Sequence, residues 1–152
     1  MQNYKEYLEK QYESDVTVDQ VLENYLECTI SESVFRSVFS FFKKSTIYFL
    51  SDMTCVDYKD HFMMFYQLFS TQDHKHLCIK MKVADYDNPQ VPTLTGLWQT
   101  ANWHEREIYD LMGIDFPGHP DMKRILMWEG YQGYPLRKDF IINPVKKSWE
   151  VT

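Results

Sequence analysis

Residues 62–83 read FMMFYQLFSTQDHKHLCIKMKV, and this stretch decides the class of fold. Its first part, Phe62–Phe69, is an almost unbroken apolar run, which is typical of a central strand. Its last part, Leu77–Val83, alternates between apolar and mainly polar side chains, as a strand with one buried face does. The link Gln72–Lys75 is short and polar, so the two strands are predicted to be neighbours in a hairpin.

Upstream of this stretch, the sequence predicts two more strands and a helix. A third strand is expected from Ile47–Leu50 toward Val56, joined to the central strand by the polar link Tyr58–His61. A short strand is expected near Tyr25–Ile30, and residues 3–13 have the spacing of an amphipathic helix. Together these elements predict an α+β fold, with a small, mainly antiparallel sheet covered by helices on one face.

A second helix is predicted over residues 32–44, between two of the expected strands. Ser31 stands at the position of its N-terminal cap. Its apolar face is expected to consist of Val34, Phe35, Val38, Phe41 and Phe42.

A third helix is predicted over residues 102–112, after a single helical turn at Leu94–Trp98. Thr100 or Asn102 can cap its start, and Gly113 stands where a left-handed residue is wanted at its end. Its apolar side is expected to consist of Trp103, Ile108, Leu111 and Met112.

The chain changes character after this helix. Residues 113–152 hold four of the five glycines and four of the six prolines, so a further long helix is not expected there. They carry a net charge of +1 (6 Lys+Arg against 5 Asp+Glu), whereas residues 1–112 carry −7 (10 against 17). Residues 125–140 are nevertheless rich in apolar side chains, and such a segment usually lies along a surface, its own or a partner's. We therefore divide the chain into an α+β domain, 1–112, and an extended Gly/Pro-rich C-terminal arm, 113–152.

Composition narrows the class of protein. With 152 residues, of which 44% are hydrophobic, the chain is long enough for one domain with a real core. The net charge of −6 disfavours a nucleic-acid binder. No apolar run has the length of a membrane span, and the first residues lack the pattern of a signal peptide. Cys28, Cys55 and Cys78 are far apart, which predicts reduced, mainly buried thiols in a cytosolic setting rather than a metal or cluster site.

Two histidines raise the question of catalysis. His104-Glu105 opens the zinc-hydrolase pattern His-Glu-x-x-His, but the fifth position is Ile108, so the second ligand is missing. His119, in a Gly-His-Pro sequence, is predicted to be a turn histidine that hydrogen-bonds the backbone. A free-standing hydrolase that uses either histidine with a carboxylate is the alternative, although neither a nucleophile elbow nor a phosphate-binding glycine loop accompanies them.

Charged residues crowd the third predicted helix and are complemented in the arm. The helix carries Glu105, Arg106, Glu107 and Asp110, and the arm carries Arg124, Arg137 and Lys138. Because arginine forms planar bidentate pairs with carboxylates, we predict a salt-bridge network that pins the arm to this helix. Contacts of these charges with another protein of a larger assembly are the alternative.

Residues 101–140 closely resemble the signature of the 30-kilodalton subunit of respiratory complex I, NADH:quinone oxidoreductase, which is also called its C subunit. The family pattern opens with Glu-Arg-Glu, two variable residues, an acidic residue and two apolar ones. A histidine, a basic residue with two aliphatic ones, and a closing Gly-x-Pro-Leu-Arg-Lys-Asp-Phe follow. The matching residues are Glu105, Arg106, Glu107, Asp110, Leu111, Met112, His119, Lys123, Ile125, Leu126, Gly133, Pro135, Leu136, Arg137, Lys138, Asp139 and Phe140.

The resemblance implies a subunit with no chemistry of its own. The chain would carry no cofactor, because flavin and iron–sulfur clusters are expected on partner subunits. It would support the quinone-reducing module of the proton-pumping complex, in its peripheral arm on the cytoplasmic side of the membrane. The equivalent subunit of a group 4 membrane-bound hydrogenase, a deazaflavin-linked dehydrogenase or photosynthetic complex I is the alternative.

The resemblance also implies the partners. The chain would pack against the hydrogenase-like large subunit and lie near the small iron–sulfur subunit, with indirect contact to the membrane arm and none to nucleic acid. The residues expected to hold the arm or to form this interface are Glu105, Arg106, Glu107, Asp110, His119, Arg124, Arg137, Lys138 and Asp139.

Overall fold

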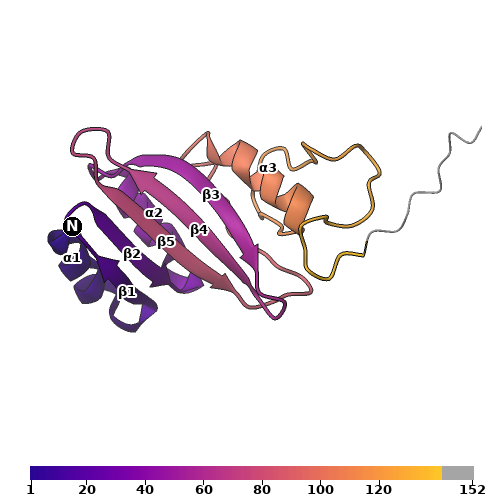
Figure 1. Cartoon of the computed structure of the whole chain (residues 1–152). Helices are drawn as coiled ribbons and strands as arrows, with labels where there is room; N and C mark the ends of the chain where they lie inside the picture. Colours follow the sequence, from indigo (N-terminus) through magenta and orange to yellow (C-terminus); the bar gives the residue numbers. More distant parts are fainter. Residues whose placement is uncertain (142–152) are drawn as a thin grey trace, which may run out of the picture.

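The structure is a computed structural model, which describes residues 1–141 (Figure 1). Residues 142–152, the end of the expected arm, lie outside the described residues. The elements follow in the order α1 (Gln2–Tyr12), the 3₁₀ turn η1 (Glu13–Asp15), β1 (Val16–Val21), β2 (Tyr25–Ile30), the 3₁₀ turn η2 (Glu32–Val34), α2 (Phe35–Lys43), β3 (Phe49–Asp57), β4 (Phe62–Phe69), β5 (His76–Val83) and α3 (Ala101–Met112).

The five strands form one sheet in the order β1-β2-β5-β4-β3. The predicted hairpins are confirmed, since β3 pairs with β4 and β4 with β5, both antiparallel. β2 pairs with β5 in parallel, a pairing between distant segments that no local pattern announces. Strand β1 was not predicted, because this edge strand buries only Val16 fully and carries polar side chains along most of its length. The predicted α+β class, with a mainly antiparallel sheet, is confirmed.

Large side chains fill the layer between the sheet and the helices. α2 lies behind the strands in Figure 1, and α3 lies at the β3 end of the sheet. The ring centroids of Phe35 and Phe39 on α2 are 5.8 and 4.8 Å from that of Tyr66 on β4. The indole N–H of Trp98 donates to the carbonyl oxygen of Tyr48 at 2.6 Å, which ties the segment before α3 to the strand layer.

The second helix differs from the prediction at both ends. The residues expected to form one helix from 32 to 44 form η2 and then α2, which ends at Lys43. Ser31 makes no capping bond; its hydroxyl donates instead to Asp15 at 2.5 Å, because the start of β1 brings that carboxylate within reach. Phe39 is fully buried, whereas Phe41, which was expected on the buried face, is only half-buried.

The third helix ends as predicted, because Gly113 takes the left-handed conformation with φ +74°. Its buried face is different from the one expected. Trp103 is 62% exposed, whereas the carboxylates of Glu105 and Asp110 are fully buried with Ile108. The face is set by contact with β3 and with the arm, and hydrophobicity alone did not reveal it.

The start of the arm belongs to the core of the domain. Ile114 is fully buried and Phe116 is 2% exposed. Asp115 bridges in parallel to Gln90, with the Val91 N–H donating to the Asp115 carbonyl at 2.9 Å. Within residues 1–141, none of the helices has the length and apolar character that crossing a membrane requires.

Candidate protein-docking site

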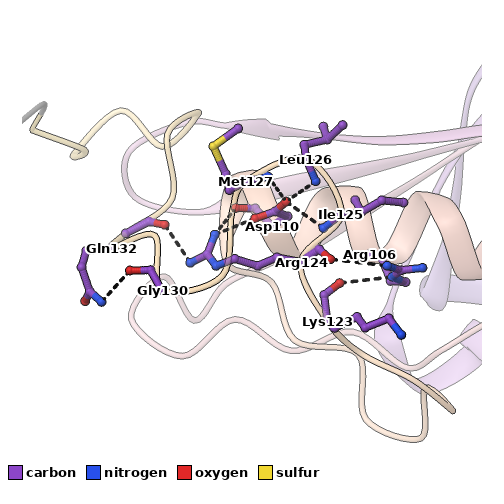
Figure 2. Close-up of polar contacts among 10 residues, drawn as sticks. Arg106, Asp110, Lys123, Arg124, Ile125, Leu126, Met127, Gly130 and Gln132 are labelled. Carbon is purple, nitrogen blue, oxygen red and sulfur yellow. Dashed lines mark hydrogen bonds and ion pairs between the residues drawn. The ribbon is translucent and has the colours of Figure 1, made fainter. Parts of the chain in front are cut away.

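One buried carboxylate on α3 holds the middle of the arm. Oδ2 of Asp110 accepts the backbone N–H groups of Ile125, Leu126 and Met127 at 3.0, 2.7 and 2.8 Å (Figure 2). Oδ1 accepts Nη1 of Arg124 at 2.6 Å. Burial opposes ionisation of Asp110, but these donors outweigh it and lower the pKa of the carboxyl below its usual value. We call these contacts the first anchor of the arm.

Two arginines extend the first anchor to both sides. Nη2 of Arg124 donates to the carbonyl oxygen of Gly133 at 3.0 Å, across the turn that the arm makes. The same guanidinium lies 5.3 Å from the ring centroid of Tyr134. On α3, Arg106 donates to the carbonyl oxygens of Lys123 and Arg124 at 3.2 and 3.4 Å (Figure 2). The predicted pairing of this helix with Arg124 is therefore present in the structure.

A second buried carboxylate, which no sequence pattern singled out, holds the end of the arm. Asp57, the last residue of β3, is 3% exposed. It accepts the N–H groups of Lys138 and Lys59 at 2.7 and 2.6 Å and the hydroxyl of Tyr86 at 2.8 Å. Burial opposes its ionisation, and the three donors nevertheless lower its pKa. An acidic residue at a strand end carries no local signal for this second anchor, because Lys138 comes from far along the chain.

The other cations of the arm do not pair with α3 as predicted. Arg137 pairs bidentately with Asp139, at 2.9 and 3.0 Å, and its guanidinium lies 4.3 Å from the ring centroid of Tyr86. The ammonium group of Lys138 lies 5.8 Å from the ring centroid of Tyr58. The reason is geometric: the second anchor draws this part of the arm to the end of β3 rather than to the helix.

The two glutamates of α3 take no part in pinning the arm. Glu105 is fully buried and accepts the Thr93 hydroxyl at 2.6 Å and the Leu94 N–H at 2.7 Å. Burial raises its pKa to about 7, and these two hydrogen bonds lower it only in part. Glu107 is exposed, and it makes no ion pair within residues 1–141. The prediction that both pair with arm cations is wrong for the described residues.

The histidines and cysteines lie in structural positions. His119 accepts the Asp121 N–H at Nδ1 (3.1 Å) and has Nε2 3.3 Å from the carbonyl oxygen of Asn102, which is the predicted backbone contact in a turn. His104 has Nδ1 3.6 Å from a carboxylate oxygen of Asp52. All three cysteines are free and buried, as predicted. Among residues 1–141, no group of three or more His, Cys, Asp or Glu is placed to hold a metal ion.

Between the two anchors, the arm presents apolar side chains to solvent. We call residues 125–136 the docking loop. Leu126, Trp128 and Leu136 are 57%, 63% and 56% exposed, although they belong to a well-anchored loop. The ring centroids of Trp128 and Tyr131 are 4.7 Å apart in an edge-to-face arrangement. An anchored, exposed apolar loop is typical of a surface that another protein covers.

Fold and site together define a class: a small α+β domain that carries a preformed apolar loop, held by buried carboxylates, for contact with another protein. Within that class, the chain belongs to the family of the respiratory-chain NADH dehydrogenase 30 Kd subunit, whose model matches residues 28–146.

Curated relatives agree with this family. The chain is 48% identical over 101 residues to the NADH-quinone oxidoreductase C 2 subunit of Rhizobium etli, covering 64% of this chain and 53% of that protein. It is 42% identical over 92 residues to the NADH-quinone oxidoreductase C/D 2 subunit of Aquifex aeolicus, covering 59% of this chain and 15% of the relative. The chain thus spans about half the length of the first of these relatives.

Two solved structures share the fold. A trypsin-resistant fragment of Nqo5 superposes with a TM-score of 0.67 at 28% identity, covering 78% of this chain and 98% of the fragment. A chain of the membrane-bound sulfane sulfur reductase, described as an archaeal respiratory membrane complex, superposes with a TM-score of 0.82 at 24% identity, covering 99% of this chain and 91% of its own. At that identity the second likeness concerns the fold alone.

Proposed function

We propose that this chain is the non-catalytic 30-kilodalton-type subunit of a complex I-type NADH:quinone oxidoreductase. In this proposal it supports the quinone-reducing module in the peripheral arm, on the cytoplasmic side of the membrane. It belongs there to an enzyme whose chemistry other chains perform. Family membership supports the type of complex, and the docking loop supports the structural role.

The proposed partner of the docking loop is the hydrogenase-like large subunit. The Aquifex aeolicus relative, whose name joins the letters C and D of two such proteins, supports this choice, because two proteins fused in one organism often associate as separate chains in another. The exposed side chains at Leu126, Trp128 and Leu136 suit an apolar groove on such a partner. We further propose that the small iron–sulfur subunit is a neighbour, and that flavin and iron–sulfur clusters are bound by partner subunits.

A second candidate is the equivalent subunit of a related respiratory complex. The likeness of fold to a chain of the sulfane sulfur reductase complex keeps this candidate open. The domain offers nothing that distinguishes the two, because the electron donor is bound elsewhere in either complex.

Affinity purification of the tagged full chain from its native membranes, followed by mass spectrometry, tests the proposal. Recovery of flavin- and nucleotide-binding subunits with the large subunit is the expected result. Recovery of the large subunit without a nucleotide-binding module would instead assign the chain to the related complexes. Recovery of no respiratory subunit at all would contradict both candidates.

A further inference from the structure

An open cavity lies between α2 and the segment before α3, away from the docking loop. Its volume is about 610 Å³, within the range of roughly 300 to 1,000 Å³ that is typical of small-molecule sites. The lining residues come from α2, from the segment 93–97 and from the turn at 118–120: Arg36, Ser40, Thr93, Leu94, Thr95, Gly96, Leu97, Gly118 and Pro120.

The polar chemistry of this cavity is one-sided. Arg36 is the one charged residue in the lining. Within residues 1–141, its guanidinium makes neither an ion pair nor a hydrogen bond, so its donors are available. Glu32, one turn earlier in the chain, lines an adjoining cleft of about 220 Å³ rather than the cavity itself. An unspent arginine without a carboxylate in the lining is unusual on a chain whose net charge is −6.

Further donors surround the arginine. Ser40, on the same side of α2, has a hydroxyl that makes no hydrogen bond within the described residues. The backbone N–H groups of Gly96 and Gly118 likewise find no acceptor there. A guanidinium, hydroxyl groups and glycine amides are the donors with which proteins bind phosphate oxygens.

The wall of the cavity is rigid before any ligand arrives. Thr93 donates its hydroxyl to the buried Glu105 and accepts the Thr95 N–H at 3.1 Å. Leu94 donates its N–H to the same carboxylate. Leu94, Leu97 and Pro120 provide an apolar side for the carbon part of a ligand.

From this arrangement we propose that the cavity binds a phosphate-bearing small molecule, with Arg36 paired to the phosphate oxygens. The phosphate sits against α2 and the glycine amides, and the organic part lies along the apolar side. The proposal does not depend on the partners of the docking loop.

The test is a titration of the full chain with inorganic pyrophosphate, followed through the amide signals of Gly96 and Gly118. Saturable shifts are expected for the unmodified chain. Arg36→Gln should weaken the apparent Kd by about tenfold or more, since it removes a charge-assisted pair. The matched control is Lys44→Gln, which removes one positive charge from the exposed end of the same helix, outside the cavity, and should leave the Kd within about twofold.

A second variant blocks the cavity without touching its charge. Gly96 has an ordinary φ, and a Cβ built there meets no atom within 4 Å. Gly96→Val should therefore keep the unfolding midpoint of the parent while abolishing the shifts at Gly118. Absence of saturable shifts in the unmodified chain, or binding by Arg36→Gln or Gly96→Val as tight as that of the parent, would overturn the proposal.

The same variants distinguish the source of the phosphate. Glycerol phosphate represents a free metabolite, and phosphatidylcholine vesicles with and without phosphatidic acid represent a lipid headgroup. Arg36-dependent binding of glycerol phosphate alone assigns the cavity to a free small molecule, as proposed. Arg36-dependent sedimentation only with phosphatidic acid vesicles retains the phosphate site but overturns its assignment to a free molecule.

Discussion

Two buried carboxylates on α3 illustrate how environment decides the charge of a residue. Asp110 accepts three backbone N–H groups and an arginine, so its pKa falls despite burial. Glu105 accepts one N–H and one hydroxyl, and burial raises its pKa to about 7. Asp110 is consequently a permanent anion that anchors the arm, whereas Glu105 changes its charge near neutral pH.

Glu105 should make the stability of the domain fall with rising pH. Its folded pKa of about 7 lies above the ordinary value of 4.5, so the folded state keeps a proton that the unfolded state releases. The stabilisation is complete below about pH 4.5 and is lost as pH rises through about 7, a total of roughly 3 kcal/mol. Glu105→Gln should abolish this decline in urea unfolding measured between pH 5 and pH 8.

The window from pH 5 to pH 8 isolates Glu105 from its neighbours. The pKa of Tyr66, which faces it from β4, is raised by burial, and burial raises that of Cys55 on β3 to about 12, so both stay neutral. Glu107→Gln, which neutralises an exposed carboxylate on the same helix, is the matched control and should keep the profile of the parent. A Glu105→Gln variant with an unchanged profile would show that Glu105 titrates normally.

Removing the charge of Asp110 should release the arm. Asp110→Asn replaces one acceptor oxygen by a donor that faces N–H groups or Arg124, and it should lower the free energy of unfolding by about 3 kcal/mol. Chemical denaturation measures this loss. The control is Asp121→Asn, which breaks an exposed pair with Lys123 and should leave the midpoint unchanged. Equal midpoints for the two variants would contradict the role given to the first anchor.

At the scale of elements, α3 and the arm meet most closely at a glycine. Gly113 has φ +74°, and a Cβ there would lie 2.5 Å from the ring of Tyr134. Gly113→Ala should cost about 2 kcal/mol or more of unfolding free energy, since it combines backbone strain with a steric overlap. Thermal unfolding checks this expectation.

A glycine elsewhere and a second substitution separate the two causes. Gly96→Ala, at an ordinary φ and with open space around it, should leave the melting temperature close to that of the parent. In a Tyr134→Ala background the overlap is gone, so Gly113→Ala should cost only the backbone strain, about 1 kcal/mol. An equal cost in both backgrounds would mean that the ring moves aside freely.

At the scale of the whole molecule, the docking loop and the rest of the surface should respond differently to polar substitution. Leu126→Ser should reduce recovery of the large subunit in the affinity purification by about tenfold, because it removes an apolar contact from the proposed interface. Leu22→Ser is the matched control, since Leu22 is 55% exposed against 57% for Leu126 and lies between β1 and β2. Neither change should alter the stability of the isolated chain.

Equal loss of the partner in both variants would point to a general effect of adding a hydroxyl to the surface. Unchanged recovery in both would remove the docking loop from the interface. The assignment of the chain to its family would survive either result, because the match over residues 28–146 does not depend on this loop's partner.

Local patterns were sufficient for most elements of the fold. The apolar run of β4, the alternation of β5 and the glycine at the end of α3 each reflect interactions within a few residues, so their positions followed from the sequence. The signature over residues 101–140 likewise predicted the family, which the family model confirms. For the candidate site, the sequence indicated the carboxylates and cations involved and the pairing of Asp110 with Arg124.

Only the tertiary structure decided which charges meet and which remain alone. Asp57 acts as an anchor because the fold brings Lys138 to the end of β3, and Glu105 is buried without a cation because α3 turns that side chain toward the core. The parallel pairing of β2 with β5 and the cavity beside Arg36 also join segments far apart in the chain. Residue type and spacing specify short-range geometry, whereas the partner of a buried polar group depends on where the whole chain packs, and that information has no local period.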